Sequence, residues 1–282
     1  MKTVGVIGAG VMGRGVVHSL LLSNVKVKLI DVSNEILEDA IQEIKRSLRF
    51  QCLFNKNIKV NNIDDLINKV KISTSVDFLN DADIIIENGP EILAVKEDIY
   101  KELNKGIKDD AIILVNTSCI SITKIASLMK NKERVIGVHF MNPVYAKNTL
   151  EVIKGEHTSN ETIEETVSFL KSLGKESIIV NDYPGFVSNR ISHLFMNEAA
   201  FVVQDSVASP SQVDAIFKEC FEHKMGPLET ADLIGLDTVV NSLDILYESY
   251  NDPKFRVCPL LRKMVHSGYL GRKSGKGFYE YK

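Results

Sequence analysis

The sequence has few of the residues that mark a disulfide-bonded, metal-binding or membrane-spanning protein. It contains no tryptophan and four cysteines, and Cys52, Cys119, Cys220 and Cys258 form no CxxC pair or other metal-ligand spacing. Scattered thiols of this kind are typical of a reduced, cytoplasmic protein, so we expect neither a disulfide framework nor a metal site. No apolar run approaches the ~20 residues that cross a bilayer, and the first residues lack the cleavage site of a signal peptide. We therefore expect no membrane partner.

A surplus of charge of one sign is also lacking. Lys and Arg together number 34 and Asp and Glu 37, and the formal net charge is −3. So small a net charge provides no general electrostatic attraction to the phosphates of nucleic acid, and we expect no nucleic-acid partner. Hydrophobic residues at 44% and charged residues at 25% exclude a disordered, collagenous or coiled-coil chain. At roughly 100–200 residues per domain, the 282 residues indicate two domains.

The first two-thirds of the chain alternate short, β-branched apolar runs with segments of helical periodicity. Continuous apolar strands that alternate with helices indicate a parallel sheet covered on both faces. The predicted strands are Val4–Ile7, Val25–Ile30, Val70–Ser73, Ile84–Glu87, Ile112–Val115, Val135–Phe140, Glu151–Lys154 and Ser177–Val180.

The pattern changes after residue 184. Helical periodicity then dominates, and it predicts helices near Val187–Asp205, Ser211–Phe221, Leu228–Tyr250 and Leu260–Ser267. We therefore predict an α/β domain with a doubly wound, mainly parallel sheet over residues 1–184, followed by an all-helical domain over residues 185–282.

A glycine-rich turn follows the first predicted strand and opens a helix. Its sequence is Gly8-Ala9-Gly10-Val11-Met12-Gly13. In a G-x-G-x-x-G turn the first glycine permits the tight turn, the second lets the backbone approach a pyrophosphate, and the third packs helix on strand. The helix N-terminus adds N–H groups and a partial positive charge. A turn that uses glycine only for packing is the alternative, but the strand–turn–helix context favours a dinucleotide site.

Asp31 ends the second predicted strand, where a carboxylate accepts hydrogen bonds from an adenosine ribose. Val32, Ser33 and Asn34 follow it, so no arginine is present there to bind a 2′-phosphate. The sequence therefore predicts NAD, rather than NADP, as the cofactor.

Three polar side chains lie near the ends of later strands. Ser118 follows the fifth predicted strand, His139 lies in the sixth and Glu151 begins the seventh. Ligands of open α/β sheets bind beyond the carboxyl ends of the strands, so Ser118 and His139 should converge there. A histidine held by a glutamate is suited to take a hydroxyl proton while a hydride leaves the same carbon.

With these features together, the sequence resembles the L-3-hydroxyacyl-CoA dehydrogenase family from residue 2 to residue 282. The motifs are GVIGAGVMG at 5–13, ENGPE at 87–91, NTS at 116–118, HFMNP at 139–143, LEVI at 150–153, DYPGFVSNR at 182–190, MGPLETADLIGLDT at 225–238 and GRKSGKGFY at 271–279. The resemblance implies a Rossmann-like NAD domain, a helical dimerisation domain and a homodimer. It also implies reversible oxidation of a 3-hydroxyacyl thioester to the 3-oxoacyl form.

Matched position by position, the resemblance assigns roles to individual residues. It implies that His139 and Glu151 form the catalytic pair, and that Ser118 and Asn189 polarise the substrate oxygen. The cofactor contacts that it implies are Gly8, Ala9, Gly10, Val11, Met12, Gly13, Asp31, Glu91, Lys96, Ser118, Asn142 and Lys273. The substrate contacts that it implies are Ser118, Asn189, Ser47 and Lys56. We interpret the remaining histidines, among them His18 and His193, as surface or capping residues.

The chain departs from the family pattern beside the predicted catalytic pair, His139 and Glu151, and in the helix after the second strand. Tyr145–Thr149 stands where the family often has Pro and then Met-Lys-Leu, and Cys119 replaces a serine. The segment 46–59 carries fewer lysines than is usual. The sequence therefore leaves three alternatives for the form of the substrate. The acyl group could be carried on CoA or on the pantetheine arm of an acyl carrier protein, or the substrate could be a free hydroxy acid. A non-catalytic dinucleotide-binding protein is the alternative to an enzyme, and the presence of all four predicted catalytic residues favours the enzyme.

Overall fold

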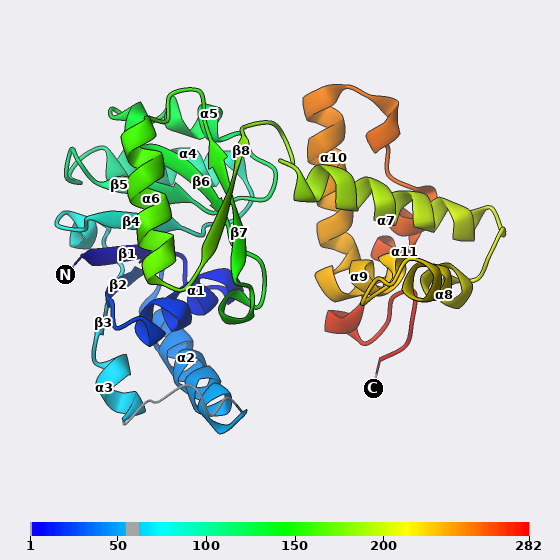
Figure 1. Ribbon diagram of the computed structural model, residues 1–282, viewed down its shortest axis with the longest axis horizontal. Coiled ribbons are helices and arrows are strands. Elements are labelled where there is room, and N and C mark those ends of the chain that lie inside the picture. The colour runs from blue at the N-terminus through cyan, green and yellow to red at the C-terminus, as the bar shows by residue number, and fades with distance from the viewer. Residues whose placement is uncertain (1, 55–61, 282) are drawn as a thin grey trace. The chain divides into compact units, whose positions relative to one another are not determined.

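The computed structural model describes residues 2–54 and 62–281, and Figure 1 shows how the elements follow one another. The chain forms two compact units, Met1–Asp182 and Tyr183–Lys282. Each unit has its own hydrophobic core, the first built around the sheet and the second among helices. The predicted substrate contact Lys56 lies outside the described residues.

Within the described residues, the first unit is built on an eight-stranded sheet in the order β3-β2-β1-β4-β5-β6-β7-β8. All neighbouring strands pair parallel except β6 and β7, which pair antiparallel. The doubly wound, mainly parallel sheet is therefore confirmed. The strands are β1 (Thr3–Ile7), β2 (Lys26–Ile30), β3 (Val70–Ser73), β4 (Ile84–Glu87), β5 (Ile112–Val115), β6 (Val135–His139), β7 (Thr149–Lys154) and β8 (Glu176–Asn181).

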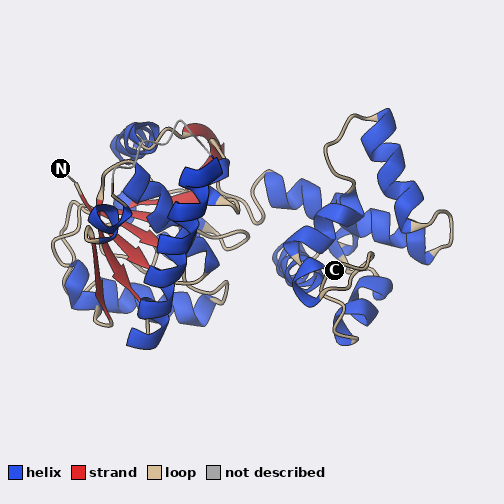
Figure 2. Cartoon of the chain, turned by 90° about the horizontal axis from the view of Figure 1, so that it is seen from below, coloured by secondary structure: helices blue, strands red, loops and turns tan. Residues whose placement is uncertain are grey.

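Helices cover both faces of this sheet, as Figure 2 shows. Because both faces are covered, every residue of β4 and β5 is buried. This explains why their sequences are continuous apolar runs and do not alternate between apolar and polar residues. The helices of the first unit are α1 (Val11–Leu22), α2 (Asn34–Phe54), α3 (Ile63–Ile67), α4 (Leu93–Leu103), α5 (Ile122–Ala126) and α6 (Asn160–Ser172). Helix α2 buries Leu37, Ala40, Ile44 and Leu48, which are spaced to form one apolar face.

The second unit is helical, as predicted. Its helices are α7 (Ser188–Gln204), α8 (Pro210–Cys220), α9 (Pro227–Ile234), α10 (Leu236–Tyr250) and α11 (Pro259–His266). The single helix predicted over Leu228–Tyr250 is wrong, because α9 ends and α10 begins at Gly235. Gly235 has φ +105°, a backbone conformation that an L side chain rarely adopts and that no continuous helix contains.

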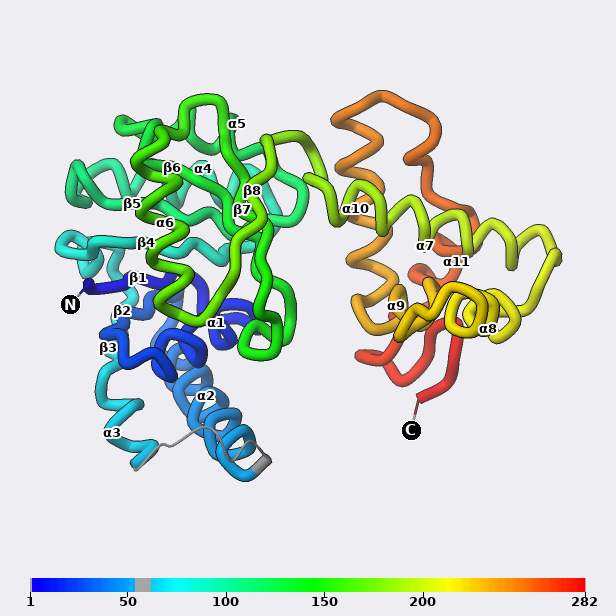
Figure 3. Tube along the Cα trace, in the orientation of Figure 1, coloured from blue at the N-terminus to red at the C-terminus, as the bar shows by residue number. Residues whose placement is uncertain are grey.

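The last described segment of the chain returns to α9, and the red end of the trace in Figure 3 follows this path. The Asp232 carboxylate accepts hydrogen bonds from the N–H groups of Phe278 and Tyr279, both at 3.0 Å, and from the Tyr281 hydroxyl at 2.9 Å. Burial raises the pKa of Asp232, while these hydrogen bonds act in the opposite direction. One carboxylate of α9 thus fixes the C-terminal segment within the second unit.

Across residues 2–54 and 62–281, no helix combines the length and the apolar character that crossing a membrane requires.

Candidate active site

In the glycine turn between β1 and α1, the space beside Gly10 is open, whereas Gly8 and Gly13 are closely packed. A Cβ on Gly8 would lie 2.7 Å from the Asn88 carbonyl oxygen, and one on Gly13 would lie 1.7 Å from the Gly8 carbonyl oxygen. A Cβ on Gly10 meets nothing within 4 Å, and no side chain caps the N-terminus of α1. The turn therefore fits the pyrophosphate of NAD, which requires open space over the backbone and available N–H groups.

Asp31 lies directly after β2 and is tied to this turn. Its Oδ2 accepts a hydrogen bond from the Ala9 N–H at 2.6 Å, and its Oδ1 accepts one from the Val32 N–H at 2.6 Å. The carboxylate is half-buried. It is thus fixed beside the glycine turn, at the position where a ribose would extend from the pyrophosphate.

His139 and Glu151 are directly opposite each other in the antiparallel pair of β6 and β7. His139 Nδ1 lies 3.0 Å from Glu151 Oε2, and both residues are buried, with 6% and 8% of their surface exposed. A carboxylate only accepts hydrogen bonds, so Nδ1–H is the donor, and in this tautomer of the imidazole Nε2 is the basic nitrogen.

Ser118 lies beside that basic nitrogen. It follows β5, which pairs with β6, and its Oγ is 3.4 Å from His139 Nε2. The structure thus brings Ser118, His139 and Glu151 together at the carboxyl edge of the central strands. This arrangement can accept a proton from a hydroxyl group and orient an oxygen next to the same histidine. Their catalytic roles stay predictions.

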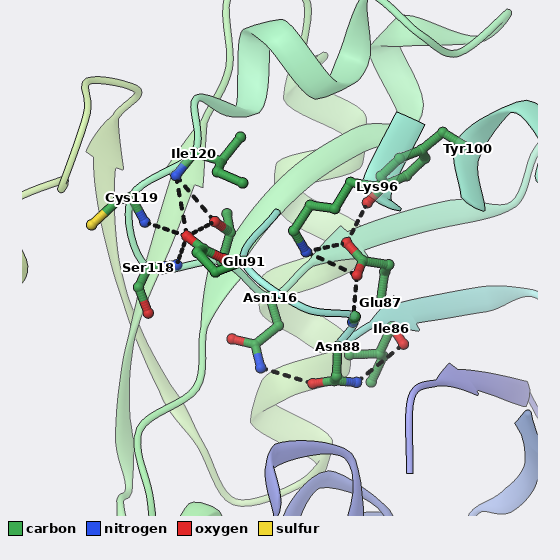
Figure 4. Close-up of polar contacts among 12 residues, drawn as sticks. Ile86, Glu87, Asn88, Glu91, Lys96, Tyr100, Asn116, Ser118, Cys119 and Ile120 are labelled. Carbon is green, nitrogen blue, oxygen red and sulfur yellow. Dashed lines mark hydrogen bonds and ion pairs between the residues drawn. The ribbon is translucent and has the colours of Figure 1, made fainter. Parts of the chain in front are cut away.

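One oxygen of the Glu91 carboxylate is bound by the loop that carries Ser118. This oxygen, Oε1, accepts hydrogen bonds from the Thr117 hydroxyl at 2.6 Å and from the N–H groups of Ser118 at 3.0 Å and Cys119 at 2.8 Å. The Ile120 N–H lies at 3.4 Å from the same oxygen. Figure 4 shows these donors gathered around one carboxylate.

Asn116 connects the ends of three strands, and sequence reasoning gave it no role. Its side-chain amide donates to the Asn88 side chain at 2.7 Å, and its carbonyl accepts from the Phe140 N–H at 3.1 Å. Asn88 packs against Gly8 of the glycine turn, and Phe140 follows His139. Its place directly before Thr117-Ser118, at the end of a buried strand, is the signal from which a role could have been inferred.

Lys96 is fully buried, with 0% of its surface exposed. Its ammonium donates to both oxygens of the Glu87 carboxylate, at 2.8 and 2.7 Å, and the Tyr100 hydroxyl donates to the same carboxylate at 2.9 Å. Burial, and then the charge of Glu87, raise the pKa of Tyr100 well above its ordinary value. Lys96 is one of the predicted cofactor contacts. In the structure its ammonium pairs with the Glu87 carboxylate inside the protein, and this ion pair joins α4 to β4 (Figure 4).

His18 and Ser47 face each other between α1 and α2. The His18 Nδ1 is 2.8 Å from the Ser47 hydroxyl, and the other ring nitrogen contacts Gln51. The ring stacks on Tyr145 at 4.9 Å between centroids. His18 is buried, so its interpretation as a surface residue is wrong, and this burial lowers its pKa.

A cavity of about 230 Å³ lies beside these side chains. Its lining includes Val11 of the glycine turn, the predicted cofactor contact Asn142, the predicted substrate contact Ser47, and Tyr145. Residues predicted to contact cofactor and substrate thus share one hollow of the first unit.

The remaining predicted site residues belong to the second unit. Asn189 lies in the first turn of α7, and its carbonyl oxygen is 3.0 Å from Nδ1 of His193, which is buried rather than at the surface. Lys273 forms an exposed ion pair with Asp237 at 2.6 Å. In the part of the chain that the structure describes, no group of three or more His, Cys, Asp and Glu residues is placed to hold a metal ion.

Comparison with known proteins gives matches over the whole chain. Residues 3–183 match the model for the 3-hydroxyacyl-CoA dehydrogenase, NAD binding domain, and residues 185–281 match the model for the C-terminal domain of that enzyme. A probable 3-hydroxybutyryl-CoA dehydrogenase of Bacillus subtilis is 39% identical over 281 residues, which cover 100% of this chain and 98% of the relative.

Two further matches agree with these. A 3-hydroxybutyryl-CoA dehydrogenase of Bradyrhizobium diazoefficiens is 39% identical over 282 residues, covering 100% of this chain and 96% of the relative. The crystal structure of an (S)-3-hydroxybutyryl-CoA dehydrogenase from Ralstonia eutropha superimposes with a TM-score of 0.93 at 38% identity, over 100% of this chain and 99% of that one.

Proposed function

Because this chain belongs to the 3-hydroxyacyl-CoA dehydrogenase family and uses NAD, we propose that it interconverts a short-chain 3-hydroxyacyl-CoA and the corresponding 3-oxoacyl-CoA. The observation that carries this proposal is the buried pair of His139 and Glu151, with Ser118 beside the other ring nitrogen, Nε2. Relatives of similar length whose names specify 3-hydroxybutyryl-CoA support a short acyl chain and a CoA thioester.

The chain's own residues bind the cofactor in this proposal. The backbone of the Gly8–Gly13 turn holds the pyrophosphate, and Asp31 accepts from the hydroxyls of the adenosine ribose. When bound, NAD supplies the acceptor for the hydride that leaves the carbinol carbon.

The proton follows a separate path, along the dyad. In the oxidative direction His139 Nε2 takes the proton of the substrate hydroxyl, because Nδ1 already carries a proton that it donates to Glu151. The Glu151 carboxylate then stabilises the imidazolium that forms, and it holds the ring in the orientation that keeps Nε2 available. In the reductive direction the same nitrogen returns the proton to the 3-oxo oxygen.

Ser118 and Asn189 orient the reacting oxygen. The Ser118 hydroxyl lies next to His139 Nε2, so an oxygen that contacts the histidine also reaches the serine. Hydrogen bonds from preorganised donors favour the carbonyl carbon as hydride acceptor, because they stabilise charge that develops on the oxygen. Asn189 has this role by its match to the family motif DYPGFVSNR.

A direct assay with three forms of one substrate tests the proposal. Purified protein, NADH and acetoacetyl-CoA should give a steady loss of absorbance at the reduced nicotinamide wavelength. We expect acetoacetyl-pantetheine to show a higher KM, because it lacks the nucleotide part of CoA, whose phosphates pair with cationic side chains. Equal rates with acetoacetyl-CoA and acetoacetyl-pantetheine, and a faster rate with the acyl carrier protein form, would show that the acyl group is carried on a carrier protein. Absence of turnover with all three forms would overturn the proposed function.

A further inference from the structure

We propose that Glu91 is a positioning residue for catalysis: its carboxylate fixes the loop 117–120 so that the Ser118 hydroxyl stays against His139. This inference rests on the proposed function and extends it to a residue that does not touch the reacting atoms. It also differs from a direct cofactor contact, the role that the sequence resemblance implies for Glu91.

The loop encloses the Glu91 carboxylate as a concave set of donors. Three consecutive N–H groups, from Ser118, Cys119 and Ile120, lie 2.8 to 3.4 Å from one oxygen of the carboxylate. Successive N–H groups that converge in this way form an anion-binding nest, and here the anion comes from the protein itself. The Thr117 hydroxyl adds a donor at 2.6 Å. Hydrogen bonds to an ionised acceptor are shorter and stronger than neutral ones, so the Glu91 oxygen is a strong acceptor for this loop.

Glu91 is held from its other side. It lies between β4 and α4, and α4 is joined to β4 by the buried contacts of Lys96 and Tyr100 with Glu87. The same Glu87 carboxylate accepts from the Gly89 N–H, which fixes the turn that leads to Glu91. The carboxylate is thus attached to a rigid base in the sheet, and the Ser118 loop is attached to the carboxylate (Figure 4).

The position of the Ser118 hydroxyl follows from this arrangement. The loop's next residues are fixed independently, because the Asp182 carboxylate accepts from the Ser121 hydroxyl and from the Ile122 and Thr123 N–H groups. Asn116 is fixed on the other side by its bonds to Asn88 and Phe140. Between these two anchors, Glu91 is an acceptor for the loop N–H groups of Ser118 and Cys119, so its removal takes away two hydrogen bonds that position the segment carrying the Ser118 side chain.

Two substitutions at Glu91 separate positioning from cofactor contact. Glu91→Gln keeps a carbonyl oxygen that can accept the same hydrogen bonds, whereas Glu91→Ala removes the acceptor. We expect Glu91→Ala to lower kcat for acetoacetyl-CoA by ~10²-fold, the loss that a displacement of about 1 Å can cause. NADH affinity, measured by fluorescence titration, should change less than about twofold. Glu91→Gln should recover most of kcat. Glu97→Ala, an exposed change on α4, the helix that follows Glu91 in the chain, is the matched control and should behave as wild type.

Thr117 gives a second pair of variants in case Glu91→Ala does not fold, as judged by circular dichroism. Thr117→Val removes the hydroxyl that donates to Glu91 and accepts from the Ile120 N–H, and Thr117→Ser keeps it. We expect Thr117→Val to lower kcat with unchanged NADH affinity, and Thr117→Ser to retain it.

The results that would overturn the proposal are distinct from failure of the proposed function. Wild-type protein without acetoacetyl-CoA turnover would contradict the proposed function and, with it, this inference. Active wild type with unchanged kcat in Glu91→Ala and Thr117→Val would contradict only the inference. A rise in the NADH dissociation constant that matches the loss of kcat in Glu91→Ala would make Glu91 a cofactor contact instead.

Discussion

At the scale of single residues, strand register sets the geometry of the proposed catalytic pair. His139 and Glu151 form a direct cross-strand pair, so a slip of one residue between β6 and β7 would turn one of the two side chains to the other face of the sheet. The N–H of Phe140, the residue after His139, is also held by the Asn116 amide. The histidine is thus fixed through its backbone as well as its ring.

His139→Gln should lower kcat by ~10²–10⁴-fold, the usual contribution of a general acid–base group. Glu151→Gln should also be slow, because a neutral amide does not stabilise an imidazolium. NADH affinity should hardly change in either variant, since the ring lies at the strand ends and not in the glycine turn. Initial rates and fluorescence titration measure the two quantities, and His157→Gln, at an exposed histidine, is the control. A His139→Gln variant with most of its kcat would contradict the assignment.

The position of the Asp31 carboxylate predicts a preference for NADH over NADPH. Its carboxylate is fixed by the N–H groups of Ala9 and Val32, and it would repel a 2′-phosphate placed beside it. NADH should therefore be used far better than NADPH. Asp31→Ala should raise the KM for NADH and weaken this preference, whereas Asp77→Ala, at an exposed aspartate, should do neither. Equal initial rates with equal concentrations of NADH and NADPH in the wild type would show the role of Asp31 to be wrong.

At the scale of elements, the attachment of α4 to β4 depends on a buried ion pair. Lys96→Met leaves the Glu87 carboxylate buried without its counter-charge, and we expect a loss of about 3–5 kcal/mol in the free energy of unfolding. Urea denaturation measures this loss. Lys101→Met, at an exposed position of the same helix, should leave stability unchanged. A Lys96→Met variant of wild-type stability but weakened NADH binding would instead support the predicted cofactor contact.

The packing of α1 on α2 introduces a pH dependence through His18. Burial lowers the pKa of His18 below its ordinary value of 6.5, so the unfolded chain binds a proton that the folded protein does not. The free energy of unfolding should therefore fall as the pH drops below about 6.5 and recover above it. Urea denaturation at about pH 7.5 and at about pH 5.5 measures the difference, which His18→Gln should reduce. An identical difference in wild type and His18→Gln would exclude this contribution.

Most elements of the fold were predictable because their physical causes are local. The apolar strand runs, the glycine turn and the change to helical periodicity after residue 184 each depend on neighbouring residues. The break at Gly235 was missed because a glycine within a helical pattern does not reveal a positive φ. The antiparallel direction of β7 and the contacts of Glu91, Asn116 and Lys96 arise from pairing between distant segments, which periodicity does not report.

At the scale of the whole molecule, the helical unit exposes large apolar side chains. Ile191, Val207, Ile216, Phe221 and Leu233 are all more than half exposed. Apolar surface of this kind on a helical unit is typical of an interface, and pairing about a twofold axis is the commonest way to cover it. We therefore expect a homodimer. Light scattering at micromolar concentration should give twice the 31.5 kDa mass of the chain, and the mass of a monomer would contradict this prediction.

In the proposed reaction this chain transfers a hydride between NAD and the third carbon of a short acyl-CoA, with His139 moving the proton. Mass spectrometry of the products, together with the amount of NADH consumed, tests this reaction. Incubation with acetoacetyl-CoA and NADH should form 3-hydroxybutyryl-CoA, one molecule for each NADH oxidised, and His139→Gln should form it far more slowly. Oxidation of NADH without this product would rule out the proposed reaction, and a His139→Gln variant that forms it at the wild-type rate would rule out the role of His139.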